Sequence, residues 1–179
     1  GPRHHHADLQ RALLLHRRGF RVASRFQVQG ASHHPAALRF GTLGQQAPRI
    51  DLAAYSLEVR GGPLATRVGD LSLGAHPQLL NSFAARGASL RLGVGQRADL
   101  TVAASSGSQI VGWDNPLGLA TPQHRLLSAN LGVELDPARP GGLRLELSAL
   151  QASLLPIASY TQGVVNDAEE SRGYGLRLA

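Results

Sequence analysis

The sequence predicts an all-β protein built as an antiparallel up-and-down meander, forming a barrel or part of a barrel. Three observations predict it: apolar and polar residues alternate along most of the chain, several alternating segments reach ten or more residues, and the connections alternate in length. Successive side chains of a strand point to opposite faces, so alternation indicates strands with one apolar face. A soluble β-sandwich or jelly roll is the alternative, because two apolar sheet faces that meet in a dry core give the same pattern.

The first predicted element is a short helix over residues 8–18, which ends an N-terminal tail (1–18) before a single β domain (19–179). Alternation then predicts nine strands, near 18–29, 36–43, 52–60, 64–73, 85–94, 98–105, 124–135, 142–150 and 172–178. Strands of globular proteins average about five to six residues, whereas membrane-spanning strands need about nine to eleven. The strand lengths therefore favour a membrane barrel.

The predicted connections are short after odd-numbered strands and longer after even-numbered ones. The short ones are 30–35, 61–63, 95–97 and 136–141, and the longer ones are 44–51, 74–84, 106–123 and 151–171. In a meander, this alternation collects the short turns at one end of the sheet and the long loops at the other. That asymmetry is typical of outer-membrane barrels.

Composition excludes several classes of protein. The 179 residues carry 18 arginines and no lysine against 12 acids, a formal net charge of +6. Apart from Arg11, Arg17 and Arg18, the arginines are spread singly without interleaved aromatic residues. This spread argues against a nucleic-acid-binding surface. With no cysteine there are no disulfides or thiolate metal sites. No apolar run approaches the roughly 18 residues of a membrane helix, so any membrane span would have to be β.

Two passages carry a resemblance to a known class. The run Arg67-Val68-Gly69-Asp70, followed by Phe83-Ala84-Ala85-Arg86-Gly87 and an alternating strand, resembles strand-to-strand passages in bacterial outer-membrane β-barrels of the usher and porin kind. The resemblance implies a barrel in the bacterial outer membrane or at the cell surface, in contact with the lipid bilayer. Nine strands, few aromatic residues and a start at Gly1 without methionine predict a barrel segment completed by other segments of a longer chain.

If the apolar faces meet lipid, the charged alternating positions point into the interior of the barrel. We expect these residues to line it: Arg21, Arg25, Arg60, Arg91, Glu134, Arg144 and Glu146. Arginines outnumber acids among the inward positions, so the interior would favour anions. In the sandwich alternative the same residues coat a soluble surface.

Two loops carry candidate ligand-binding residues. In loop 107–123, Trp113 beside Asp114 and Asn115 combines an apolar ring with polar groups, as a carbohydrate site of a secreted sandwich would require; the alternative is a tryptophan that only anchors its loop. Near the C-terminus, oxygen donors could bind calcium or pair with Arg172: Asn166, Asp167, Glu169 and Glu170. The common nucleophile, metal and phosphate motifs of enzymes are absent, so we predict no enzymatic activity and no further cofactor.

Overall fold

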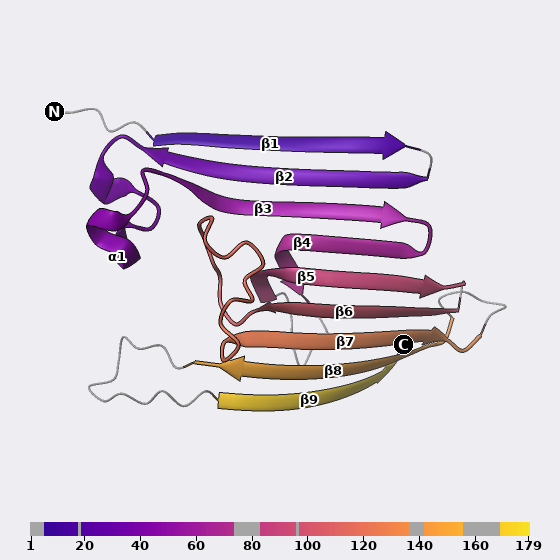
Figure 1. Cartoon of the computed structure of the whole chain (residues 1–179). Coiled ribbons are helices and arrows are strands. Elements are labelled where there is room, and N and C mark those ends of the chain that lie inside the picture. The colour runs from indigo at the N-terminus through magenta and orange to yellow at the C-terminus, as the bar shows by residue number, and fades with distance from the viewer. Residues whose placement is uncertain (1–5, 18, 74–82, 96, 137–141, 156–168) are drawn as a thin grey trace.

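A computed structural model describes residues 6–17, 19–73, 83–95, 97–136, 142–155 and 169–179. It contains one antiparallel sheet of nine strands in the order β1 to β9, which confirms the predicted all-β meander (Figure 1). The strands are β1 (His6–Arg17), β2 (Phe20–Ala31), β3 (Ile50–Gly61), β4 (Leu64–Leu73), β5 (Phe83–Val94), β6 (Ala98–Ser106), β7 (Arg125–Glu134), β8 (Arg144–Leu154) and β9 (Glu169–Leu178). Within the described residues the sheet is open, with β1 and β9 as its two edges.

The predicted helix over residues 8–18 is wrong, because this segment forms β1. Every residue of β1 pairs with β2, from His6 opposite Ala31 to Arg17 opposite Phe20. A helix of about ten residues is marginal in water without packing. Pairing with the neighbouring strand satisfies the backbone of β1 along its whole length, and this outweighs the local helical pattern.

The predicted strand over residues 36–43 is also wrong. The structure places three short helical elements there: η1 (His34–Ala36), α1 (Phe40–Leu43) and η2 (Gly44–Gln46). Pro35 lies in the first turn of η1, where its fixed φ and missing N–H suit a helix start and not a strand. The predicted count of nine strands is nevertheless correct, because β1 was not predicted and the strand predicted at 36–43 does not form.

Connections of different length leave the two ends of the sheet, as predicted (Figure 1). Among the described connections, 62–63 after β3 and 95–97 after β5 are short, whereas 32–49 after β2 and 107–124 after β6 are long. The predicted short turn at 30–35 belongs to the long connection 32–49, and the connection between β1 and β2 takes its place. Because neighbouring strands are antiparallel and the sheet has an odd number of strands, the edge strands β1 and β9 run in the same direction.

The two faces of the sheet differ sharply in polarity. Residues that pair directly across strands share a face. One row of such pairs runs Phe20, Gly61, Leu64, Leu92, Leu100, Leu131, Leu147, Leu176, and we call its side the apolar face. The parallel row on the other side runs Arg21, Arg60, Ala65, Arg91, Thr101, Asn130, Ser148, Gly175, and we call its side the polar face.

Two paired glycines allow one hairpin to leave the sheet. Gly69 pairs with Gly87, and it is the last residue of β4 that pairs with β3. Gly69 has φ +108°, and a Cβ there would collide with the Tyr55 carbonyl oxygen, so only glycine fits this position. A Cβ on Gly87 would likewise collide with the carbonyl oxygen of Ala104. Beyond these glycines, residues 70–73 and 83–86 pair only with each other in the sheet.

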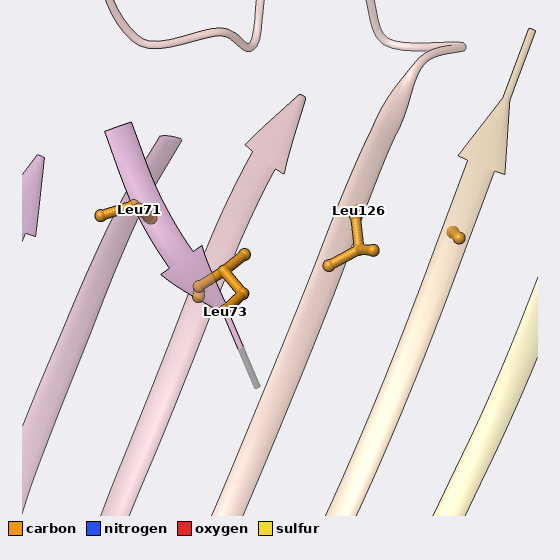
Figure 2. Close-up of a cluster of buried hydrophobic side chains, with 5 residues drawn as sticks. Leu71, Leu73 and Leu126 are labelled. Atoms are coloured by element: carbon orange, nitrogen blue, oxygen red, sulfur yellow. The ribbon is translucent and has the colours of Figure 1, made fainter. Parts of the chain in front are cut away.

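The end of this hairpin folds over the polar face and forms the main apolar core. Leu71 and Leu73 pack against Ala103, Leu126 and Ala152 of the strands beneath (Figure 2). Leu71 and Leu126 retain only 3% and 4% of their exposure. At about 25 cal/mol per Å² of buried apolar surface, burial of each leucine contributes roughly 2 kcal/mol. The long-loop end of the polar face is therefore covered, while its short-turn end is open.

Candidate functional site

The polar face carries all the charged residues that we predicted for the interior of a barrel. The register places on it Arg21 and Arg25 of β2, Arg60 of β3, Arg91 of β5, Glu134 of β7, and Arg144 and Glu146 of β8. The same face holds four further charged residues: Glu58, Arg67, Asp99 and Arg177. The strand register thus places all of these charges on one face of the sheet.

Arg144 is the centre of a charge network over β6, β7 and β8. Its guanidinium donates to Asp99, to Glu134 at 2.9 Å and to Glu146 at 3.2 Å. Gly132 makes this possible, because a Cβ at that position would occupy the place of the guanidinium. Arg91 lies 3.5 Å from Asp99, and Arg177 lies 3.7 Å from Glu146. These three arginines and three acids balance each other.

The other half of the polar face, over β2 to β4, has an excess of positive charge. Glu58 accepts hydrogen bonds from both Arg60 and Arg67. Arg21 and Arg25 are exposed, and neither forms an ion pair within the part of the chain that the structure describes. This half therefore carries a net positive charge, whereas the charges of the half around Arg144 balance.

Buried Arg86 holds loop 107–124 where the hairpin has left the sheet. Its side chain is fully buried, and Nη1 donates to the carbonyl oxygens of Gly112 at 2.6 Å and Asn115 at 3.4 Å. The guanidinium lies 5.3 Å from the ring centre of Tyr55 and 3.5 Å from Asp70. Both contacts favour the charged side chain and offset part of the cost of burying it.

Two backbone contacts complete the attachment of this loop to β3. The Gly112 N–H donates to the Leu52 carbonyl oxygen at 2.7 Å, and the Tyr55 hydroxyl donates to the carbonyl oxygen of Pro116. Asp70 in turn accepts a hydrogen bond from the Tyr55 N–H at 2.7 Å. Backbone groups of β3 that lost their strand partner are satisfied in this way.

Arg39 joins the connection between β2 and β3 to the same loop. It donates to buried Asp51 and to Asp114, whose side chain is 74% exposed. The hydrogen bond to the Asp114 carboxylate, with a further one to Asp51, raises the pKa of Arg39 above its usual value, although desolvation opposes this. Three side chains thus attach the loop, those of Arg86, Tyr55 and Arg39, beside the backbone hydrogen bond from Gly112 to Leu52.

The three residues predicted for the carbohydrate site have different surroundings in the structure. The Trp113 side chain is 53% exposed, Asp114 is held by Arg39, and the carbonyl of Asn115 accepts from Arg86. Of the predicted calcium ligands, Asn166 and Asp167 lie outside the described residues. Glu169 and Glu170 begin β9 opposite Leu154 and Ser153, on opposite faces of the strand. Among the described residues, no three acidic, histidine or cysteine side chains are grouped to hold a metal ion.

Sequence reasoning did not single out Asp51, and it did not predict the contacts of Arg39, Gly69 or Gly87. Arg86 and the two glycines stood in the passages that carried the resemblance, but their role depends on φ and on contacts between distant segments. Searches of protein-family models, curated proteins and solved structures found no match to this chain. No helix among the described residues is long and apolar enough to cross a membrane.

Proposed function

We propose that this chain forms part of the wall of an outer-membrane β-barrel, with the apolar face against lipid and the polar face against an aqueous interior. The observation that carries the proposal is the separation of the two faces along the row of paired residues from Phe20 to Leu176. Leu64, Leu92, Leu100, Leu131 and Leu147 occupy one row and are 37–43% exposed. Soluble monomers rarely expose a continuous apolar surface of this extent.

Strand length supports the same proposal. β7 has 10 residues, which rise roughly 33 Å at about 3.3 Å per residue. Tilted by about 45°, such a strand spans roughly 23 Å, close to the apolar band of about 25 Å around membrane barrels. The paired charges on the opposite face match a polar interior, where ion pairs avoid contact with lipid.

In this proposal the role of the barrel is structural or that of a conduit. The hairpin end of β4 and β5 and loop 107–124 lie at the long-loop end, where they narrow the interior. The open edges of β1 and β9 expose unpaired backbone groups, which cannot be left unsatisfied in hydrocarbon. Further strands, from other segments of a longer chain, would complete the wall.

A period-two accessibility scan along β7 tests the proposal. Since the native sequence has no cysteine, single cysteines at Ala129, Asn130 and Leu131 can each carry an environment-sensitive fluorophore. In liposomes with a quencher on the acyl chains, labels at 129 and 131 should be quenched, and the label at 130 should be quenched by aqueous iodide. Equal quenching at all three positions, or failure of the chain to associate with liposomes, would overturn the proposal.

Carbohydrate binding by loop 107–123 is the second candidate, favoured by the exposed ring of Trp113 next to a carboxylate that Arg39 holds in place. An aromatic ring face and fixed polar groups are what sugar recognition uses. A glycan-array screen tests it. Binding by the native chain that is lost in Trp113→Ala would support a surface or secreted binding protein, and no bound glycan would exclude this role among the sugars sampled.

A further inference from the structure

The polar face divides into a neutral half and a positive half. Over β5 to β9, Arg91, Arg144 and Arg177 are matched by the same number of carboxylates, all within 3.7 Å of an arginine nitrogen. Over β2 to β4, four arginines face a single available acid, Glu58. The two other acids of these strands, Asp51 and Asp70, form ion pairs with Arg39 and Arg86. Arg60 and Arg67 share the carboxylate of Glu58, and Arg21 and Arg25 form no ion pair among the described residues.

Arg25 lies at a hollow with both polar and apolar walls. It pairs across the strands with Ser56, and both line a hollow of about 460 Å³. Its other polar residues include Glu58, Arg67, Asp70 and Ser72, and β1 contributes the apolar residues Ala12, Leu13 and Leu14. Both acids of this hollow already accept from or lie against arginines of their own. A hydroxyl beside a free guanidinium provides two kinds of donor for an anionic oxygen.

Arg21 extends this positive surface toward the short-turn end. It lies on the same face of β2, four residues before Arg25, so the two residues are roughly 13 Å apart at about 3.3 Å per residue. In the register Arg21 stands between His16 of β1 and Arg60 of β3, so its nearest neighbours in the row are also basic residues. Basic groups gathered on one side of a confined aqueous space raise the local concentration of anions.

We propose that Arg21 and Arg25 form a binding track for small oxyanions, that is, phosphate or sulfate groups, with the main site at Arg25 and Ser56. The inference rests on the proposed function, in which this face borders the water-filled interior. The guanidinium of Arg25 supplies planar paired donors that match two oxygens of such a group, and Arg21 supplies a second cation along the path. The neutral half over β5 to β9 would not bind these anions.

Calorimetric titration of the detergent-solubilised full chain with inorganic pyrophosphate tests the proposal at low ionic strength. The Arg25→Gln variant should weaken binding about tenfold or more, and Arg21→Gln should weaken it less. Arg172→Gln is the matched control, because it removes the same charge from an exposed arginine that lies on the apolar face of β9. Circular dichroism checks that each variant keeps the β-sheet of the native chain.

The outcomes are distinct. Loss of affinity in Arg25→Gln with native affinity in Arg172→Gln supports the site. No binding by the native chain, or an equal loss in all three variants, would overturn it, the latter showing an effect of net charge only. Because the fluorophore scan reports lipid contact separately, a chain that inserts without binding pyrophosphate refutes only the anion site. A chain that binds but does not insert refutes only the membrane proposal.

Discussion

Replacing Arg86 with methionine should loosen loop 107–124 while leaving the sheet largely intact. Methionine retains most of the buried side-chain length but has no N–H donors. The Gly112 carbonyl oxygen would lose its 2.6 Å hydrogen bond and the Asn115 carbonyl oxygen its 3.4 Å one. The loop would still be attached through Tyr55 and Arg39.

The expected magnitude follows from these contacts. A hydrogen bond to a charged group contributes about 1.5–3 kcal/mol, and the second, longer one adds less. The free energy of loop opening should therefore fall by about 2–3 kcal/mol, a roughly 30- to 150-fold rise in the open population at about 1.4 kcal/mol per factor of ten. Global stability should fall by less, because Arg86 Nε and Nη2 are buried without hydrogen bonds, so their desolvation cost disappears with them.

Native-state proteolysis measures this difference. Chymotrypsin cleaves after Trp113 and Leu117, which lie in the loop, only when several residues around the site become extended. The control is Arg91→Met on the same strand, where the arginine is 62% exposed and has one ion pair at 3.5 Å, so cleavage should stay within about twofold of native. Equal cleavage of Arg86→Met and native protein would refute the assigned role of Arg86.

Three further predictions concern the core, the charge network and the loop. Leu126→Ala should lower the free energy of unfolding by about 2–4 kcal/mol, read from urea titration, because it leaves a cavity under Leu71 and Leu73; a loss below about 1 kcal/mol would mean that the hairpin end does not pack there. Gly132→Val should displace the Arg144 guanidinium from its carboxylates and lower the melting temperature. Gly93→Val is the control, because a Cβ at that position would meet only Pro63, at an ordinary contact distance of 3.7 Å. Trp113→Ala should leave the melting temperature unchanged within about 1–2 °C, since the ring is half-exposed; a larger drop would make this tryptophan a loop anchor and not a ligand-binding residue.

The sequence allowed the meander and its two faces to be predicted, because a period of two depends only on local pattern. The helix at 8–18 was predicted wrongly, since Leu13, Leu14 and Leu15 in succession fit either a helix or a strand, and pairing with β2 decided between them. The strand at 36–43 failed because Pro35 and Gly44 favour turns that its short apolar run cannot override. Residues 75 positions apart, such as Arg39 and Asp114, carry no sequence signal of their pairing.

The common direction of the two edge strands limits how this sheet can close. Direct pairing of β1 with β9, or of either with a second copy inserted in the same sense, would be parallel. It would also bring the acidic start of β1, at Asp8, to the same end as Glu169 and Glu170 of β9. If additional strands close the sheet between β9 and β1, they can be antiparallel to both edges only when their number is odd. The strand that meets each edge would begin at the short-turn end, and basic residues near its far end would complement those acids.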